Sequence, residues 1–334
     1  MADTQFDVLT IGNAIVDIIA PIEPAFLVEE GMDEGIMHLV DADRSAHLYS
    51  RMPAGKRQVS GGSAGNTAAG VANLGGRAAF VGKVADDDLG RIYADDFRQI
   101  GVHYAVNPLI GGPATARSMI LVSPGGERTM NTYLGACQQL TSADIREAEI
   151  GAAAVTYMEG YLWDPPEAKK AFVTAAHYAH KHERPTAITL SDPFCVNRYR
   201  DEFLDLMRSK TIDFVFANIE EAKALYQTDN LADAVQQIAK DCELAAITMG
   251  AQGAMAVHDG EIVTVPAFPV ESVVDATGAG DLFAAGFLLA HARGRDLRTA
   301  LSAGCLAASE VISHIGARPI RDLAQMAREH QIEI

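Results

Sequence analysis

Short apolar segments alternate with helix-like segments along most of this 334-residue chain. The strand-like segments are residues 6–11, 78–82, 155–158, 187–190, 214–216 and 245–248. The helix-like segments between them are residues 64–74, 89–100, 167–180, 201–207 and 231–239. This alternation indicates βαβ units, which place parallel strands in one sheet with helices packed against it. We therefore expect an α/β fold with a mostly parallel sheet.

Two regions interrupt this alternation. Residues 13–41 have little helix signal, and residues 115–134 alternate in the manner of strands around the turn sequence Pro124-Gly125-Gly126. Two β segments outside an α/β core can pair with each other, so we predict a small separate sheet. The predicted core comprises residues 1–12, 42–112 and 136–334, and the predicted small sheet comprises 13–41 and 113–135. Asp259-Gly260 predicts a further hairpin.

The composition excludes some classes of protein. The chain has 27 Lys and Arg against 44 Asp and Glu, a net charge of −17, which opposes binding to nucleic acids and anionic membranes. A local anion site remains compatible with this charge. The four cysteines have no C-x-x-C spacing, so neither a disulfide framework nor a thiolate zinc site is expected. Without a signal-peptide pattern or a membrane-length apolar run, we expect a cytoplasmic protein.

A glycine-rich motif, DATGAGD, covers residues 275–281 and precedes the apolar run LFAAGFLLA. The small residues Gly278, Ala279 and Gly280 would leave the first N–H groups of a helix open to an anion such as a phosphate. Asp281 in the first turn could then accept a proton from a substrate hydroxyl. The alternative is an ordinary glycine loop in which Asp281 caps the helix, and spacing alone does not separate these interpretations.

A second small-residue motif, GGSAGNT, covers residues 61–67 and precedes another helix-like segment. Gly61 and Gly62 permit close backbone approach, and the amide of Asn66 can recognise a hydroxyl. The motif also reads G-x-S-x-G, with Ser63 as the nucleophile of a serine hydrolase, which we keep as a remote alternative because no HGGG-type oxyanion loop is present. P-loop, G-x-G-x-x-G and H-R-D motifs are absent.

Taken together, the two motifs resemble the signatures of the ribokinase (pfkB) family of carbohydrate and nucleoside kinases. GGSAGNTAAGVANLGG, running on to Gly90, is similar to the first signature, and DATGAGDLFAAGF is similar to the second. Ala276 departs from the family, which usually has a hydroxyl-bearing residue there. The opening GNAIVD resembles the adenosine kinase branch. The resemblance implies a three-layer α/β/α core with a small β lid over the substrate.

The resemblance also implies roles around the substrate. The implied substrate-binding residues are Asn13, Asp17, Gly61, Gly62, Ser63 and Asn66. Asp17 would accept hydrogen bonds from the vicinal ribose hydroxyls. Arg128 is similar to the lid arginine that offsets negative charge on the transferring phosphoryl group. Asp281 would be the catalytic base, and the phosphoryl oxygens would be held by Gly278, Ala279 and Gly280. Without the resemblance, Asp17 would be interpreted as a loop acid and Arg128 as a solvated strand residue.

The second half of the chain carries the implied nucleotide and metal residues. Asn218 and Glu221 resemble the N-x-x-E element of the family, in which Glu221 would organise Mg²⁺ through water. The same two residues also predict a helix capping box, and both interpretations can hold together. The implied ATP-binding loop contains Thr248, Gly250 and Gly253.

A monovalent-cation site is implied as well. Asp275, together with carbonyl groups near His314 and Gly316, resembles the loop that binds such an ion, which would be K⁺. Two other groups of residues receive ordinary roles. His177, His180 and His182 are expected at a solvated helix end, and Tyr161, Trp163 and Phe194 are expected to pack in the core rather than against a base.

The implied reaction is ATP- and Mg²⁺-dependent phosphorylation of the hydroxymethyl (5′-OH) group of a nucleoside, adenosine or a related purine nucleoside. One alternative is a sugar kinase of the same family, acting on fructose, ribose or a ketogluconate. Another is a nucleoside-binding protein without catalysis. We expect no nucleic-acid or membrane partner, and lid sheets in this family can pair to form a homodimer.

Overall fold

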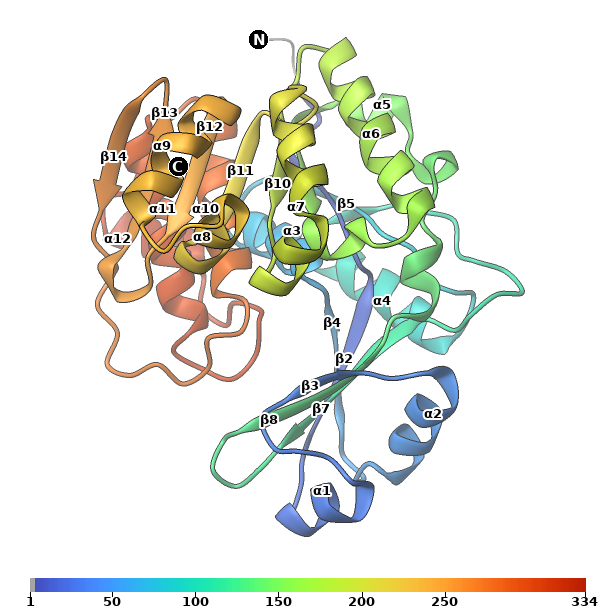
Figure 1. Cartoon of the computed structure of the whole chain (residues 1–334). Coiled ribbons are helices and arrows are strands. Elements are labelled where there is room, and N and C mark those ends of the chain that lie inside the picture. The colour runs from blue at the N-terminus through green and yellow to red at the C-terminus, as the bar shows by residue number, and fades with distance from the viewer. Residues whose placement is uncertain (1–3) are drawn as a thin grey trace.

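A computed structural model describes residues 4–334 of the chain (Figure 1). Nine strands form a large sheet, in which β13 runs antiparallel to its two neighbours, β12 and β14, and every other neighbouring pair is parallel. In spatial order they are β14 (Glu261–Val265), β13 (Ala254–His258), β12 (Leu244–Thr248), β11 (Phe214–Asn218), β10 (Thr186–Thr189), β9 (Ala153–Glu159), β1 (Phe6–Ile11), β5 (Ala78–Val81) and β6 (His103–Tyr104). The mostly parallel α/β sheet predicted from the alternation is confirmed.

Helices cover both faces of this sheet and make three layers. Val8 of β1 belongs to one buried apolar cluster and its neighbour Leu9 belongs to the other, because side chains alternate along a strand. On the face of Val8 lie α3 (Ser63–Asn73), α4 (Asp88–Gln99), α10 (Ala279–Ala292), α11 (Leu297–Val311) and α12 (Leu323–Glu329). On the face of Leu9 lie α5 (Glu147–Gly151), α6 (Pro166–Lys181), α7 (Pro193–Arg208), α8 (Ile219–Tyr226) and α9 (Leu231–Asp241).

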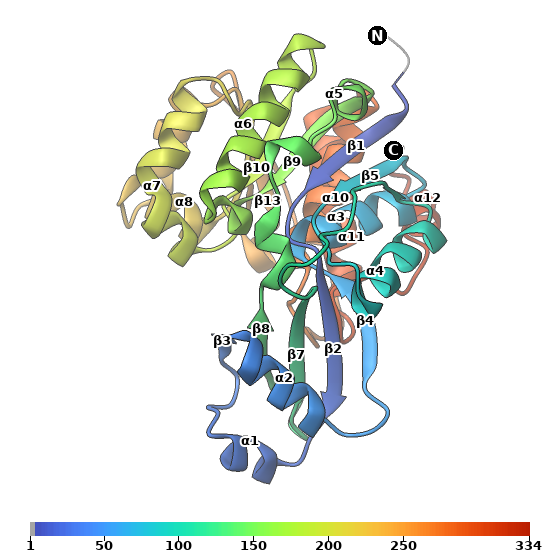
Figure 2. The ribbon, with the colours of Figure 1, turned by 90° about the vertical axis from the view of Figure 1, so that its right-hand side faces the viewer.

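A second sheet of five strands projects from one end of the core (Figures 1 and 2). In spatial order its strands are β3 (Met37–Leu39), β8 (Arg128–Tyr133), β7 (Ala116–Val122), β2 (Ile15–Pro21) and β4 (Arg57–Gly61). Two helices, α1 (Pro24–Glu30) and α2 (Ala42–Arg51), accompany it (Figure 2). Along β2, Val16 and Ile18 are buried, whereas Asp17 between them lines the cavity described below. We call this unit, residues 15–61 and 116–133, the small sheet unit.

The small sheet that the sequence predicts is present, but it draws on more of the chain. The predicted core includes residues 42–112, yet the first part of this segment supplies α2 and β4 to the small sheet unit. Polar residues dominate β4 (RQVSG), so it gives no apolar strand signal. The weak helix signal of residues 13–41 also gave no indication of α1, which begins at Pro24 and is capped after Glu30 by Gly31 in the left-handed conformation.

The predicted hairpins are both confirmed. Strands β7 and β8 pair antiparallel around residues 123–127, and β13 and β14 pair around Asp259-Gly260, where both residues have positive φ. Four short 3₁₀ segments complete the secondary structure of the described part of the chain. They are Gly135–Gln139, Ser142–Asp144, Gly160–Trp163 and Gly250–Gln252. Within residues 4–334, no helix combines the length and apolar character that crossing a membrane requires.

Candidate active site

The two sequence motifs meet at the starts of two packed helices. Gly62 precedes α3 with φ 88°, and Gly278 precedes α10 with φ 84°, conformations that glycine adopts without strain. The helices approach closely because both faces carry small residues: a Cβ at Gly70 of α3 would lie 2.7 Å from that of Ala285 in α10. This packing brings the two motifs together although they are separated by more than half the chain.

Asp281 lies in the first turn of α10 and is held by α3. Its Oδ1 accepts a hydrogen bond from the Ser63 hydroxyl at 2.6 Å, and its Oδ2 accepts one from the Asn66 side-chain amide at 2.9 Å. Burial raises the pKa of Asp281, while these two hydrogen bonds and the charge of Arg318 act to lower it. The carboxylate is thus oriented at a fixed position and faces the cavity.

The start of α10 is open in front of this carboxylate. No side chain caps the helix, and an added Cβ at Gly280 would meet no atom within 4 Å. The first N–H groups of a helix have no partner within the helix and attract anions together with the helix dipole. The geometry therefore suits a phosphoryl group at Gly278, Ala279 and Gly280, as the sequence predicts.

A cavity of about 520 Å³ lies between the core and the small sheet unit. Its walls combine strand ends of the core, the start of α10 and one face of the small sheet. The predicted site residues that line it are Asp17, Gly62, Ser63, Asn66, Asn218, Glu221, Thr248, Gly278, Ala279, Gly280 and Asp281. Ile120 of β7 and Met130 of β8 cover it from the small sheet. The structure thus places a predicted catalytic group and a predicted substrate-binding group in one space.

Asp17 projects from β2 into this cavity, opposite α10. Burial raises its pKa to about 7, and Arg318 and Arg128 counteract the rise. A Cβ at Gly61 would lie 2.3 Å from Asp17 Oδ2, so Gly61 makes room for the carboxylate without lining the cavity itself. The pair explains why a glycine stands at the end of β4.

Asn13 has a different environment from the one expected for a substrate contact. It is 3% exposed, and its backbone N–H and side-chain amide both donate to Glu159, at 3.2 and 2.7 Å. Glu159 also accepts a hydrogen bond from the N–H of Ala64 in α3, at 2.9 Å. Burial raises the pKa of Glu159 to about 7. Asn13 therefore lies behind the cavity wall, where it joins the start of β2 to the end of β9.

Arg128 connects the small sheet to the loop before α10. Its guanidinium lies 2.7 Å from Asp275 Oδ2, and both side chains are largely buried, at 10% and 7% exposure. Asp275 also accepts hydrogen bonds from the N–H and hydroxyl of Thr277 and from the N–H of Gly316. Both of its oxygens are therefore engaged and its charge is paired. In this conformation Arg128 supplies the positive charge that the predicted monovalent cation would bring to Asp275.

Asn218 and Glu221 form the predicted capping box at the start of α8. Asn218 Oδ1 accepts from the N–H of Glu221 at 2.8 Å, and both oxygens of Glu221 accept from Asn218. Burial raises the pKa of Glu221 to about 7. Within residues 4–334, no three His, Cys, Asp or Glu side chains are grouped to hold a metal ion. An acid at the cavity wall without such a group fits Mg²⁺ held mainly by water and phosphate oxygens.

A smaller cavity of about 160 Å³ adjoins the first one at the start of α10. The two share Thr248, Ala279, Gly280 and Phe283. Gly250 and Gly253, predicted as part of an ATP loop, line the smaller cavity together with Phe268. Gly253 has φ 95°, and a Cβ there would lie 2.0 Å from the carbonyl oxygen of Val265. The apolar walls of this cavity are suited to a flat ring system next to the anion-binding helix start.

Sequence reasoning missed two residues of this region. Arg318 donates from Nε to Asn66 Oδ1 at 3.1 Å, and Glu159 holds Asn13 and α3 as described above. Arg318 lies in a loop without a motif, so no local signal marks it. Glu159 directly follows the apolar run of β9, and a carboxylate at the carboxyl end of a parallel strand is a signal that could have been used.

The serine hydrolase alternative finds no support in this geometry. The Ser63 hydroxyl donates to Asp281, and none of the described residues that line the cavity is a histidine able to serve as its base. Tyr161 lines the cavity and is 45% exposed, so the core role expected for it is wrong, whereas Trp163 is buried in the core. Phe194, also expected in the core, is 74% exposed.

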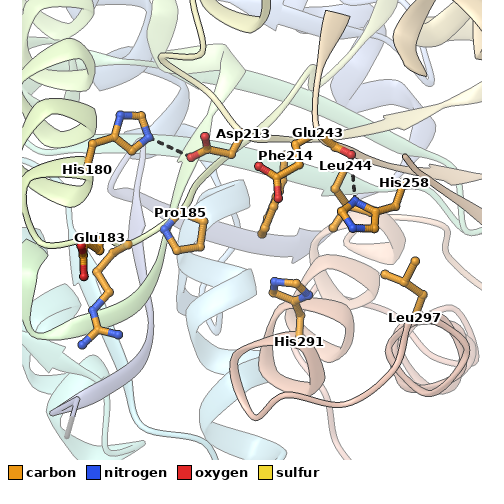
Figure 3. Close-up of a pocket in the computed structure, with 11 residues that line it drawn as sticks. His180, Glu183, Pro185, Asp213, Phe214, Glu243, Leu244, His258, His291 and Leu297 are labelled. Carbon is orange, nitrogen blue, oxygen red and sulfur yellow. Dashed lines mark hydrogen bonds and ion pairs between the residues drawn. The ribbon is translucent and has the colours of Figure 1, made fainter. Parts of the chain in front are cut away.

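A further cavity of about 460 Å³ lies at the opposite, amino-terminal edge of the sheet (Figure 3). Pro185, Asp213 and Glu243, which precede β10, β11 and β12, line it. His180, near the end of α6, lies 2.9 Å from Asp213 Oδ2 in addition to its predicted place at a helix end, and His258 lies 3.0 Å from the carbonyl oxygen of Glu243 (Figure 3). None of the predicted site residues lies there.

Comparisons with known proteins agree with the geometry. The model of the "pfkB family carbohydrate kinase" matches residues 42–322. An adenosine kinase of Saccharomyces cerevisiae is 28% identical, covering 92% of this chain and 95% of the relative. The crystal structure of an adenosine kinase from Sinorhizobium meliloti is 55% identical with a TM-score of 0.90, covering 98% and 99% of the two chains. That of a probable sugar kinase from Rhizobium etli is 53% identical with a TM-score of 0.91, covering 99% and 100%.

Proposed function

The chain belongs to the pfkB family of carbohydrate kinases, and from that premise we propose that it phosphorylates the 5′-hydroxyl of a purine nucleoside, adenosine or a close relative. The observation that carries the proposal is the pairing of two carboxylates in one cavity. Asp281 stands beside an open helix start, and Asp17 faces it from the small sheet. Such a site can hold a phosphoryl group, a proton acceptor and a polyol together.

The reaction assigns a role to each group. The substrate hydroxyl oxygen attacks the γ-phosphorus of ATP, the bond to the β,γ-bridging oxygen breaks, and ADP leaves. Asp281 accepts the hydroxyl proton, and Ser63 and Asn66 keep its carboxylate oriented. The N–H groups of residues 278–280 bind the transferring phosphoryl oxygens, which carry the developing charge.

Three further groups complete the proposed site. Mg²⁺ would be organised by Glu221 and Asn218 and would neutralise phosphate charge. Arg128 would leave Asp275 and turn its guanidinium to the phosphoryl group when the small sheet closes and excludes water. The adenine ring of ATP would occupy the apolar cavity of Gly250, Gly253 and Phe268.

The small sheet supports a nucleoside over a free sugar. Ile120 and Met130 place apolar side chains over the cavity near Asp17, and Phe216 and Tyr161 contribute aromatic surface from the core. A sugar offers hydroxyls around its whole ring, whereas a nucleoside pairs a diol with a flat apolar base. A cavity that offers a carboxylate to the diol and an apolar wall to the base therefore suits a nucleoside better than a free sugar. Two proteins of known structure share more than half of their aligned residues with this chain, and one is named an adenosine kinase and the other a probable sugar kinase.

A substrate panel tests the proposal. Purified protein is incubated with Mg·ATP and, separately, with adenosine, inosine, guanosine, cytidine, ribose, fructose and a ketogluconate. ADP release and the mass of the product are both measured. We expect adenosine or another purine nucleoside to have the highest kcat/KM and to yield the 5′-monophosphate. Highest turnover with a free sugar would replace the proposal by the sugar kinase alternative, and nucleoside binding without any turnover would replace it by a binding protein.

A further inference from the structure

Arg318 reaches the site from the loop that joins α11 to α12. Its Nε donates to Asn66 Oδ1 at 3.1 Å, and its guanidinium lies over the ring of Phe97, 5.1 Å from the centroid. Its Nη2 is buried and has no hydrogen-bond partner within residues 4–334. Burying a guanidinium whose donors are not all satisfied costs stability, so a stabilising role alone does not account for this placement.

Arg318 orients the amide of Asn66. An arginine side chain only donates, so the atom that faces Arg318 is the oxygen of the amide, and the NH₂ group faces Asp281 Oδ2 at 2.9 Å. The three side chains form a chain of two hydrogen bonds, from Arg318 through Asn66 to Asp281. Without the arginine, the amide of Asn66 would be oriented by the Asp281 carboxylate alone.

Arg318 also places a positive charge among several acids. The charged and titratable groups that act on it are Tyr93 and Asp96 of α4, Asp17 of β2 and Asp281 of α10. The charge of Arg318 lowers the pKa of both Asp17 and Asp281, whereas burial raises the pKa of each. Arg128 also lowers the pKa of Asp17 from the small sheet, whereas at Asp281 the opposing charge comes from Arg318.

We propose that Arg318 is a positioning residue for phosphoryl transfer, which holds the oxygen of the Asn66 amide so that its NH₂ group faces Asp281, and which places a positive charge near the carboxyl groups of Asp281 and Asp17. This inference rests on the proposed function for its catalytic consequence. Its electrostatic content does not, because the ionisation of the two carboxylates is measurable without any turnover. Arg318 acts through Asn66 and through its charge, and it does not receive the proton.

Two substitutions separate the hydrogen bond from the charge. Arg318→Gln removes the charge, whereas Arg318→Lys keeps a charge but has no donor at the Nε position. Arg321→Gln, three residues further on, is the matched control, because the Arg321 side chain is exposed and lies outside the cavities. The dependence of kcat and of kcat/KM on pH is measured for the wild type and the three variants between pH 5 and 9.

We expect Arg318→Gln to lower kcat at pH 7 by about 10- to 100-fold and to move the acidic limb of the pH profile upward by about one unit. Arg318→Lys should return the limb toward that of the wild type while kcat stays low, and Arg321→Gln should match the wild type. A profile of Arg318→Gln that keeps the wild-type limb overturns the proposal, whatever its height.

A ¹³C NMR titration of the Asp carboxyl groups gives the same answer without catalysis. In Arg318→Gln we expect the signals of Asp17 and Asp281 to titrate about one pH unit higher than in the wild type, and in Arg318→Lys close to it. Unchanged titration in Arg318→Gln overturns the inference. A wild-type protein that transfers no phosphoryl group would instead overturn the proposed function, and the titration would still decide the electrostatic part.

Discussion

Helices α3 and α10 begin in the same way and provide different surfaces. Each follows a glycine with positive φ, and neither has a side-chain cap. At the second position of α3 the N–H of Ala64 donates to the buried carboxylate of Glu159. At the second position of α10 stands Gly280, with open space where a Cβ would be. The chain supplies its own carboxyl group at one helix start and leaves the other open to an anion from outside.

The comparison indicates that the glycine motif alone does not define a phosphate site. Both helix starts provide N–H groups and a positive dipole end. Their surroundings decide the outcome: α3 faces an internal acid, whereas α10 faces a cavity with Arg128 nearby. The predictions below test this difference, from the largest expected effect to the smallest.

A substitution of Asp281, the third residue of α10, should have the largest effect on catalysis. In Asp281→Asn the side chain keeps its shape but no longer accepts a proton, so we expect kcat to fall by about 10³- to 10⁴-fold. Substrate affinity, measured by calorimetry, should change little. Asp296→Asn, which alters an exposed helix cap of α11, is the control and should retain wild-type kcat. Near-normal turnover of Asp281→Asn would contradict the role of Asp281 as the proton acceptor at the start of α10.

The cation beside α10 should have the next largest effect. Arg128→Gln removes the charge that pairs with Asp275 and that we assign to the phosphoryl group, so kcat should fall about 10²-fold. Arg91→Gln, on the exposed side of α4, is the control. Steady-state kinetics with saturating nucleoside and varied Mg·ATP measure the effect. Equal rates for the two variants would show that α10 works without a cation from the small sheet.

Valine introduced at the second position of each helix should weaken ligand binding at α10 and lower protein stability at α3. Gly280→Val fills the open space, so we expect Kd for a non-hydrolysable Mg·ATP analogue to rise about tenfold with unchanged stability. Ala64→Val overpacks a fully buried position and should lower the free energy of unfolding by about 1–3 kcal/mol. Calorimetry and urea unfolding of both variants test the pair. Loss of stability in Gly280→Val would contradict the open site.

Glu159, which accepts a hydrogen bond from the start of α3, should make the free energy of unfolding depend on pH. Burial raises the pKa of Glu159 from 4.5 to about 7, so the folded state binds the proton more tightly than the unfolded state. Its contribution to stability is present below pH 4.5 and is lost as the pH rises through 7. Urea unfolding between pH 4 and 8 should therefore show a smaller decline for Glu159→Gln than for the wild type. Parallel curves would contradict the role assigned to Glu159.

Much of the fold was predictable because it depends on local patterns. Apolar runs such as FDVLTI mark strands buried on both faces, and the Asp-Gly turn marks a hairpin. The polar strand β4 carries no apolar strand signal of its own, because it lies at the edge of the small sheet and pairs with one strand, β2. Its extended conformation is set by pairing with β2 rather than by its own composition.

The site was predictable where its residues lie in motifs. DATGAGD and GGSAGN each mark a helix start, and the contact between them follows from the packing of α3 on α10. The environments of Asn13 and Asp275 were not predictable, because they depend on Glu159 and Arg128, which are remote in sequence. Arg318 likewise enters from a loop without any pattern. Residue types can be recognised from sequence, whereas their partners require the tertiary structure.

The N–H groups of the two helix starts report directly on the central claim. The protein is labelled with ¹⁵N-glycine and titrated with a non-hydrolysable Mg·ATP analogue, and the assigned amide signals are followed. We predict a downfield shift for Gly280 of α10 as its N–H donates to phosphate oxygens, and an unchanged signal for Gly65 of α3. A Gly280 signal that stays in place when the analogue is bound would contradict the account.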